Sequence, residues 1–247
     1  MNKINSDSKI KGVVFDLDHT LFDRYETLKL VCHDFYTQKR EWFSENISEN
    51  EAAKIMIEAD GRNIIKGWDK VLDFWQEKGL FAVDGNGETI AKKEDVIDFI
   101  WNYAFVENAV KYPFAKGVLQ ELHKAGYKVG LLTNASDECG IRRQRAKLKM
   151  LEMENAFDEI LITGEIGLEK PCREVFDIMT ERMGIPSENM LYVGDNPIND
   201  VMGSERAGYI PVWVSLRKEY GEECDCEFAV SDVSEIPDLA DRINFGE

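Results

Sequence analysis

The stretch that decides the fold lies near the start of the chain and reads Gly12-Val13-Val14-Phe15-Asp16-Leu17-Asp18-His19-Thr20. Its apolar half predicts a buried strand, and two carboxylates follow where that strand ends. Because residues i and i+2 of an extended chain point to the same side, both carboxylates are expected to face one small volume. At ~4 Å their repulsion is roughly 4 kcal/mol with an effective dielectric of about 20. A divalent cation explains the pair, although an isolated pair can also be two solvated acids in a turn.

Short apolar runs alternate with amphipathic segments of helical length along most of the chain. This pattern is typical of an α/β fold, a Rossmann-like, doubly wound parallel sheet with crossover helices. The expected strands cover residues 10–15, 127–132, 159–162, 190–193, 210–214 and 227–230. The expected helices cover residues 115–125, 137–150, 172–183, 199–207 and 234–244.

Residues 22–111 break this alternation, because they contain no good buried strand and far exceed the roughly twelve residues that a crossover needs. Their helical patterns predict an inserted α-helical cap domain within an α/β core of residues 1–21 and 112–247. Turn signals at residues 84–87 and 112–113 mark a break inside the insert and its exit. Large aromatic side chains at helical spacing usually pack inward, so the tryptophans of the insert are expected in its own core. They are Trp42, Trp68, Trp75 and Trp101.

The composition and net charge of the chain limit the kinds of molecule that it can bind. The chain has 247 residues, 44% of them hydrophobic, which is enough for a substantial core. Its formal charge of -17 opposes binding to nucleic acid or to an acidic membrane surface, but a local cation still permits small anionic substrates. No apolar stretch approaches the ~20 residues of a membrane span, and the polar start lacks the apolar region of a signal peptide. We therefore expect a cytoplasmic protein; nothing in the sequence indicates its oligomeric state.

The five cysteines are scattered and odd in number, which favours free thiols in a reducing compartment. Cys224 and Cys226 form a C-x-C pair that could bind a soft metal. No second pair or nearby histidine completes a tetrahedral set, so a loop with two spare thiols is the favoured interpretation.

Three later segments repeat the pattern of a strand that runs into polar residues. Thr133 and Asn134 follow one apolar run, where a hydroxyl, an amide and the N-H groups of the next helix can hold phosphate oxygens. The alternative is plain helix capping by Asn134 or Ser136. Lys170 directly precedes Pro171, a residue suited to the first turn of a helix, so its backbone is expected to be stiff.

The last of these segments delivers Asp195 after Gly194, as the first segment delivers Asp16, and Asp200 lies five residues further on. Carboxyl ends of neighbouring parallel strands line one edge of a sheet, where ligands bind at the point at which the winding reverses. The segments are therefore expected to converge. Four aspartates against one lysine call for a hard divalent cation, and an all-oxygen site with room for waters suits Mg²⁺.

At this point the chain resembles the haloacid dehalogenase-like (HAD) superfamily of phosphotransferases. The resemblance rests on four motifs in the expected order, which are residues 16–20, Thr133-Asn134, Lys170-Pro171, and Gly194-Asp195 with Asp200. A helical insert directly after the first motif resembles the cap of subfamily I, which includes small-metabolite phosphatases. The resemblance implies a Mg²⁺-dependent phosphomonoester hydrolase acting on a small phosphorylated metabolite through an aspartyl-phosphate intermediate.

The resemblance also implies roles for single residues. Asp16 would be the nucleophile, and Asp18 would protonate the leaving group and then take a proton from water. Asp16 and Asp195 would bind the metal through carboxylates and Asp18 through its backbone carbonyl, with Asp200 orienting Lys170 or a metal-bound water. Thr133, the backbone of Asn134 and Lys170 would hold the phosphate.

Several other residues have no clear part in this scheme. His19 is expected to have a structural role in the turn. The basic run of residues 142–149 spreads its charge around a helix, so we expect a solvated face rather than a binding patch. Arg24 and Tyr25, at the expected junction of core and cap, are candidates for gating the substrate.

Rival functions remain open. A dehalogenase would use Asp16 but needs neither a second acid nor a metal, so Asp18 and Asp195 oppose it. A phosphomutase shares every motif, and a non-catalytic phospholigand-binding module on the same fold would be marked by loss of a motif residue, of which there is none. Transport ATPases are excluded by the lack of a membrane span. The sequence does not identify the phosphomonoester, because the insert carries no pocket motif.

Overall fold

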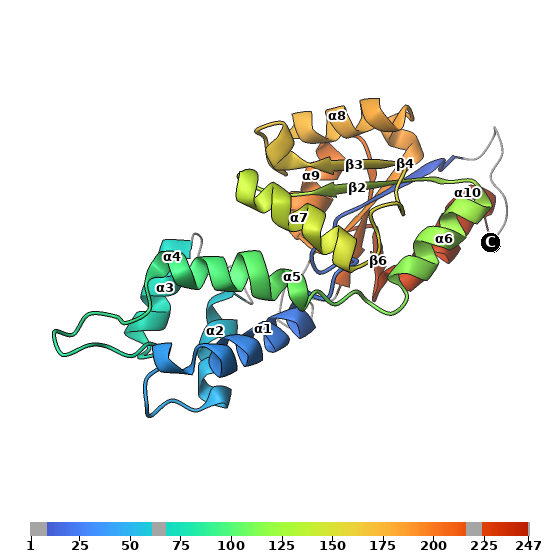
Figure 1. Ribbon diagram of the computed structural model, residues 1–247. Helices are drawn as coiled ribbons and strands as arrows, with labels where there is room; N and C mark the ends of the chain where they lie inside the picture. The colour runs from blue at the N-terminus through green and yellow to red at the C-terminus, as the bar shows by residue number, and fades with distance from the viewer. Residues whose placement is uncertain (1–8, 61–67, 216–223, 247) are drawn as a thin grey trace. The chain divides into compact units, whose positions relative to one another are not determined.

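The structure is a computed structural model that describes residues 9–60, 68–215 and 224–246 (Figure 1). It divides into two compact units, which we call the α/β unit and the helical unit. The α/β unit consists of Met1–Asp23 and Lys111–Glu247, and the helical unit is Arg24–Val110. The expected division into an α/β core of residues 1–21 and 112–247 and a cap of residues 22–111 stays a prediction.

The α/β unit is built on a six-stranded sheet with the strand order β3-β2-β1-β4-β5-β6, in which every neighbouring pair is parallel. The predicted doubly wound α/β fold is confirmed. The strands are β1 (Gly12–Phe15), β2 (Lys128–Thr133), β3 (Glu159–Ile162), β4 (Met190–Gly194), β5 (Ile210–Val214) and β6 (Phe228–Val230).

The winding reverses at β1, which lies between β2 and β4. The chain proceeds from β1 to β2 and β3 on one side and returns to β4, β5 and β6 on the other. Phe15, the last residue of β1, is in register with Leu131 of β2 and with Val193 of β4. The residues that follow these three strands therefore lie at one edge of the sheet, where α/β folds bind their ligands.

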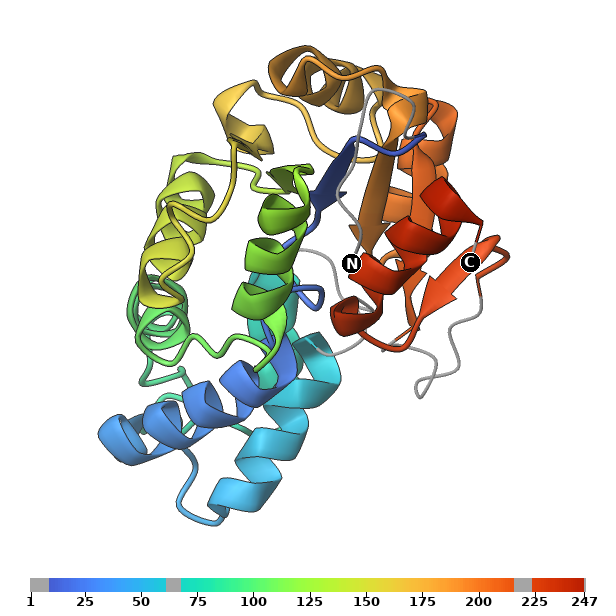
Figure 2. The ribbon, with the colours of Figure 1, turned by 90° about the vertical axis from the view of Figure 1, so that its right-hand side faces the viewer.

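Helices cover both faces of the sheet (Figures 1 and 2). On one face α6 (Ala115–Ala125) contacts β2 and α10 (Ile236–Phe245). On the other face α8 (Arg173–Met183) contacts β2, β3 and α9 (Gly203–Arg206), and buries Phe176, Met179 and Met183 in an apolar cluster. The remaining long helix of this unit, α7 (Glu138–Met150), follows β2. This packing holds the strand ends rigidly in place.

One expected helix differs from the structure. Residues 199–207 were predicted as a single helix, whereas the chain forms a π-helix, η5 (Pro197–Met202), followed by α9. The helical segment begins earlier because the side chain of Asn196 accepts hydrogen bonds from the backbone N-H groups of Ile198 and Asn199, and Pro197 fits its first turn.

The helical unit packs around aromatic side chains. Its principal elements are α1 (Arg24–Gln38), α2 (Glu49–Asp60), α3 (Trp68–Glu77), α4 (Lys93–Ile97), the π-helix η2 (Asp98–Ala104) and α5 (Phe105–Glu107). Trp75 and Trp101 are buried as predicted, and the half-buried Trp42 packs edge-on against Phe35 at a centroid distance of 6.0 Å. The side chain of Trp68 lies outside the described residues.

The predicted turn at residues 84–87 is present. The carboxylate of Asp84 accepts hydrogen bonds from the backbone N-H groups of Asn86 and Glu88, at 2.8 and 3.0 Å. An isolated bridge between Val83 and Thr89 closes the loop. Aspartate is favoured in such a turn because its side chain binds the backbone two residues further on.

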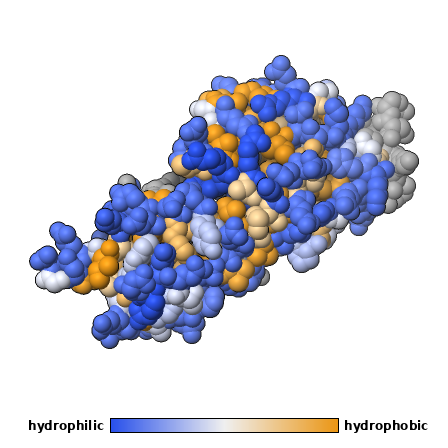
Figure 3. Space-filling view, in the orientation of Figure 1, coloured by the Kyte–Doolittle hydropathy of each residue, from blue (hydrophilic) through white to orange (hydrophobic). Residues whose placement is uncertain are grey.

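The surface in Figure 3 is mostly hydrophilic with scattered hydrophobic side chains, in keeping with the high charge of the chain. None of the helices that the structure describes is both long enough and apolar enough to cross a membrane.

Candidate active site

Three aspartates from two strand ends and the following π-helix form a buried cluster. Asp16 follows β1 and continues its ladder, since its N-H donates to the carbonyl of Val193 at 2.9 Å. Asp195 follows β4, and Asp200 lies in η5. Carboxylate oxygens of the three residues all lie within 4.8 Å of one another, and all three residues are buried. Among the described residues no other group of His, Cys, Asp or Glu has metal-ligand geometry.

Lys170 supplies a positive charge to this cluster. Its ammonium donates to Asp16 Oδ1 at 2.6 Å and to Asp200 Oδ1 at 2.7 Å, and it lies 2.9 Å from the hydroxyl of Tyr192. Three buried carboxylates against one ammonium leave an excess of two negative charges. A hard divalent cation with oxygen ligands fits this donor set, so the cluster could hold a metal ion.

The charges of the cluster shift the pKa values of its members. Burial raises the pKa of Asp16 to about 7; Lys170 opposes this shift, while Asp200 and Asp18 add to it. Burial also acts to lower the pKa of Lys170, but the neighbouring Asp16 and Asp200 outweigh it and hold that pKa well above its ordinary value. Lys170 is therefore a fixed cation, whereas the ionised form of Asp16 would be stabilised by a further positive charge.

The backbone of Lys170 is held by Asn134. The side-chain oxygen of Asn134 accepts from the N-H of Lys170 at 2.9 Å, and its amide donates to the carbonyl of Lys170 at 3.2 Å. The helix expected over residues 172–183 is present as α8, which begins at Arg173, so Lys170 and Pro171 lie before it. The position of the ammonium is set by this pair of hydrogen bonds rather than by a helical turn.

Asp200 is held against the backbone of β4. Its Oδ2 accepts from the N-H of Asn196 at 3.0 Å, and its Oδ1 accepts from Lys170. A Cβ atom added to Gly194 would lie 2.4 Å from the carboxyl carbon of Asp200, so only glycine leaves room for that carboxylate. Asp200 was expected to orient Lys170 or a metal-bound water; it contacts Lys170 and also lies within the carboxylate cluster, and its role stays a prediction.

Asp18 points to a different set of partners. Its Oδ1 accepts from the ammonium of Lys147 at 2.7 Å and its Oδ2 from the amide of Gln144 at 2.9 Å. The carboxylate of Asp18 is thus not a member of the cluster of Asp16, Asp195 and Asp200. Its expected contribution to a metal through the backbone carbonyl stays a prediction.

Thr133 and Asn134 lie at the end of β2, beside the same carboxylates. Thr133 is buried, and its hydroxyl lies 2.9 Å from the amide of Gln144. The alternative that Asn134 or Ser136 caps the next helix is wrong, because Asp137 caps α7 by accepting from the N-H of Gly140.

The interpretation of residues 142–149 as a solvated face is wrong in part. Arg142, Arg145 and Lys149 are exposed, but Gln144 and Lys147 are buried on the inner face of α7. The two buried residues are spaced three apart on a helix that also buries Leu148, and this periodic position was the signal in the sequence. Tyr192, which contacts Lys170, was also missed, because a tyrosine in a buried strand is usually a core residue.

The remaining candidates lie elsewhere. Arg24 belongs to the helical unit, where its guanidinium lies over the rings of Trp101 and Phe105 at 5.5 and 5.0 Å. Tyr25 follows it in α1, and a gating role for either stays a prediction. His19 is buried with a φ of 63°, which is consistent with a structural role in the turn after β1. Cys224 and Cys226 are free thiols outside any described group with metal-ligand geometry.

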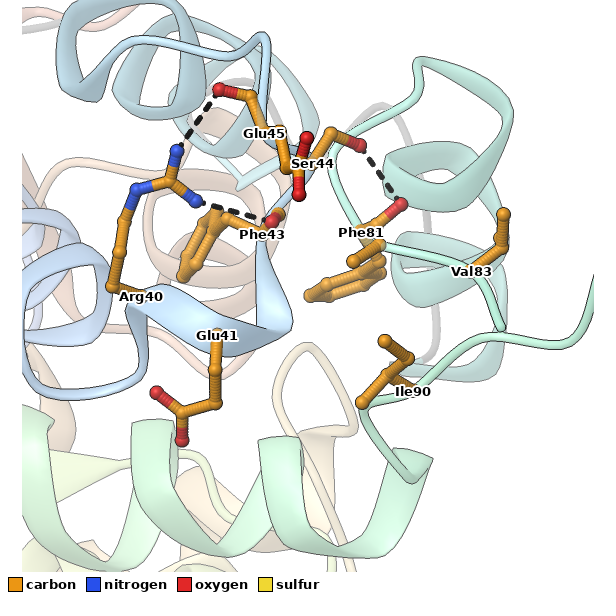
Figure 4. Close-up of a pocket in the computed structure, with 9 residues that line it drawn as sticks. Arg40, Glu41, Phe43, Ser44, Glu45, Phe81, Val83 and Ile90 are labelled. Atoms are coloured by element: carbon orange, nitrogen blue, oxygen red, sulfur yellow. Dashed lines mark hydrogen bonds between the residues drawn. The ribbon is translucent and has the colours of Figure 1, made fainter. Parts of the chain in front are cut away.

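The helical unit contains an open pocket of about 780 Å³ (Figure 4). Phe43 and Phe81 form its floor, Val83 and Ile90 line one side, and the guanidinium of Arg40 donates to the carbonyls of Phe43 and Glu45. Glu41, Ser44 and Glu45 also line the pocket.

The model of the family described as haloacid dehalogenase-like hydrolase matches residues 13–214. The chain belongs to this family. The match includes all the carboxylates described above, Lys170 and the whole helical unit. The predicted family and the predicted class of enzyme, a HAD-like hydrolase, are confirmed; the subfamily and the role of the helical unit as a cap stay predictions.

Individual relatives resemble the HAD-like chain over nearly its full length. The glyceraldehyde 3-phosphate phosphatase of Methanocaldococcus jannaschii is 28% identical over 239 residues, which cover 95% of this chain and 97% of that protein. An (S)-2-haloacid dehalogenase of Pseudomonas fluorescens is 27% identical over 225 residues, covering 88% and 90%. The crystal structure of Bacillus subtilis YfnB with bound magnesium has a TM-score of 0.71 at 16% identity and covers 94% of this chain and 99% of that one, which shows the shared fold.

Proposed function

We propose that this HAD-like hydrolase is a magnesium-dependent phosphatase that hydrolyses a small phosphorylated metabolite through an aspartyl phosphate on Asp16. One observation carries the proposal, namely that the Asp16 carboxylate lies within 4.8 Å of those of Asp195 and Asp200 and accepts from the buried Lys170 ammonium. The cluster carries an excess of negative charge, which repels an anionic phosphoryl group. Asp16 is therefore suited to attack such a group only when a further cation is present.

Asp16, Asp195 and Asp200 are the residues that would hold Mg²⁺, with the backbone carbonyl of Asp18 as a further ligand. When bound, the ion would neutralise the carboxylates and the phosphoryl oxygens. Lys170 and the residues at the end of β2, Thr133 and Asn134, would hold the phosphoryl oxygens as charge moves in the transition state.

In the first half-reaction a carboxylate oxygen of Asp16 bonds to phosphorus and the ester P–O bond breaks. The leaving oxygen takes a proton from Asp18. In the second half-reaction water attacks the phosphorus of the aspartyl phosphate, its proton passes to Asp18, and the bond to Asp16 breaks. Inorganic phosphate is released and Asp16 is regenerated.

A dehalogenase activity is the alternative raised by the Pseudomonas relative. In that reaction halide leaves as an anion, so neither a proton donor nor a metal is required. Burial of Asp195 and Asp200 would then be costly and serve no purpose, since each buried ion loses several kcal/mol of solvation. The structure of the cluster therefore favours the phosphatase.

The test is release of inorganic phosphate from a panel of phosphomonoesters, with Mg²⁺ or with EDTA. The panel begins with glyceraldehyde 3-phosphate, the substrate named for the archaeal relative, and includes p-nitrophenyl phosphate, nucleoside monophosphates and phosphoglycolate. We expect Mg²⁺-dependent turnover by the wild type and at least about a 10⁴-fold loss in Asp16→Asn. Turnover that survives in a folded Asp16→Asn variant would exclude Asp16 as the nucleophile.

Three further measurements separate the rival functions. Halide release from 2-chloropropionate would indicate the dehalogenase. A rearranged sugar phosphate in place of free phosphate would indicate a phosphomutase, and stoichiometric retention of ligand without turnover would indicate a binding module. A cytoplasmic location stays a prediction that cell fractionation would test.

A further inference from the structure

The carboxylate of Asp18 is held at both oxygens by one helix. Lys147 donates to Oδ1 and Gln144 donates to Oδ2, and both donors come from α7. The side chain of Lys147 is only 8% exposed, whereas that of Asp18 is 27% exposed. Two donors on different oxygens fix the rotation of a carboxylate as well as its position.

The same helix ties Asp18 to the end of β2. The amide of Gln144 lies 2.9 Å from the hydroxyl of Thr133 and 3.2 Å from the carbonyl of Asn134. Lys147 also lies over the ring of Phe22, 4.5 Å from its centre. Gln144 therefore links the first motif to the expected phosphate-binding strand end, whereas Lys147 contacts Asp18 and Phe22.

The burial of Lys147 carries an energetic cost. An ammonium as deeply buried as that of Lys147 loses several kcal/mol of solvation, and an ion pair seldom recovers more than this loss. The arrangement does achieve one thing, which is to hold the Asp18 side chain in a single orientation. A fixed orientation is what a group needs in order to take a proton from the attacking water.

We propose that Lys147 and Gln144 are positioning residues that orient Asp18 for the hydrolysis of the aspartyl phosphate on Asp16. The inference rests on the proposed function. In this step the oxygen of water bonds to phosphorus, the P–O bond to Asp16 breaks, and the proton of the water passes to the Asp18 carboxylate. Loss of either donor removes one of the two hydrogen bonds that fix the rotation of the Asp18 carboxylate.

The test is Lys147→Met, followed by rapid quench with p-nitrophenyl phosphate and Mg²⁺. Departure of nitrophenolate needs little acid, so formation of the aspartyl phosphate is expected to slow by less than about 3-fold, while steady-state kcat falls about 10- to 100-fold. A burst of nitrophenolate and accumulated phosphoenzyme would result. Lys147→Arg should restore part of the rate, and Lys149→Met, an exposed lysine of the same helix, should match the wild type. Equal slowing of both steps, or an unchanged kcat, would overturn the inference.

A double-mutant cycle tests whether Lys147 acts through Asp18. If it does, adding Lys147→Met to Asp18→Asn should lower kcat by less than about 2-fold further, because residues that act as a unit are not additive. An additional loss equal to that in the wild-type background would show an independent role and overturn the proposal.

Gln144→Met keeps the inference testable if Lys147→Met does not fold, since it removes the other donor without burying a new charge. The same burst is expected, and its absence in a folded variant would count against positioning. The two levels of the argument fail differently. A wild type that releases no phosphate refutes the proposed function, whereas normal wild-type turnover with no burst in either variant refutes only this inference.

Discussion

The two units of the molecule differ in what they bury. The α/β unit buries charged side chains as well as apolar ones, among them Asp16, Lys147, Lys170, Asp195 and Asp200. In the described part of the helical unit the one buried polar residue is Thr27, and the interior is otherwise apolar and aromatic. Since a buried ion costs several kcal/mol of solvation, the difference indicates that the α/β unit carries the chemistry.

The physical basis of this difference is the backbone. The ends of β1, β2 and β4 are fixed by the sheet. The backbone therefore brings together the polar residues that follow these strands, without the need for contacts between their side chains. Helices of the second unit meet through side chains instead, as when Phe35 of α1 packs against Phe99 of η2. Such contacts yield a packed interior rather than a site.

Replacement of Lys170 is expected to have the largest effect on this contrast. Lys170→Met leaves three buried carboxylates without their ammonium, so stability should fall by about 3 to 5 kcal/mol and kcat by about 10²- to 10³-fold. Urea unfolding with and without Mg²⁺ measures the first and phosphate release the second; Mg²⁺ should recover part of the stability. Lys78→Met, which removes an exposed ion pair of 3.7 Å in the helical unit, is the control. Equal free energies of unfolding for Lys170→Met and Lys78→Met would contradict the proposed difference between the two units.

Phe35→Ala probes the apolar interior of the helical unit. Phe35 is fully buried among four aromatic rings, so its removal should cost about 3 to 5 kcal/mol. Thermal unfolding checks the loss, and Leu30→Ala, which is 44% exposed on the same helix, should have little effect. Mg²⁺ affinity of the folded Phe35→Ala variant, measured by calorimetry, should be unchanged. A large change in that affinity would show that the carboxylate cluster depends on the aromatic interior.

Gly194→Ala should have a smaller effect, confined to the cluster. The new methyl group would meet the Asp200 carboxylate at 2.4 Å, so we expect a loss of about 1 to 3 kcal/mol and weaker Mg²⁺ binding. Calorimetric titration and urea unfolding provide the two values. Gly85→Ala, which meets no atom within 4 Å in the helical unit, serves as the control. Unaltered Mg²⁺ affinity in Gly194→Ala would argue against a metal at Asp200.

The smallest effect is expected for Asp73→Asn in the helical unit. Asp73 forms an exposed ion pair of 2.7 Å with Lys93, and such pairs contribute within about 0.5 kcal/mol. Urea unfolding should therefore give a midpoint close to that of the wild type, and kcat should not change. A loss of unfolding free energy above about 1 kcal/mol would show that exposed ion pairs stabilise this protein more than expected.

Much of the α/β unit could be read from hydrophobic pattern. The expected strands at residues 159–162 and 210–214 coincide with β3 and β5, and the expected helix at 115–125 coincides with α6. Short apolar runs between amphipathic helices leave few alternatives. The helical insert was recognised from the lack of strands, but the pairing of its helices had no comparable signal because each could pack in several ways.

The convergence of Asp16 and Asp195 could also be predicted, since both follow neighbouring strands of the sheet, whereas Lys170 reaches them through a loop that Asn134 holds. The partners of Asp18 could not. Lys147 lies in a run in which Arg142, Arg145 and Lys149 are exposed, and its inward position depends on how α7 is rotated against the sheet. The role of Asn134 was missed for a similar reason, because its hydrogen bonds join residues 36 apart.

The sequence by itself determined the sheet and the carboxylates that follow the strands, because hydrophobic period and chain order are local properties. The tertiary structure decided which polar side chains lie beside the charged groups of the site. Tyr192 and Asn134 contact Lys170, and Gln144 and Lys147 contact Asp18. Those contacts depend on the rotation of the helices and on the path of the loops. Both are settled by the packing of the whole unit, in which every buried charge must find a partner.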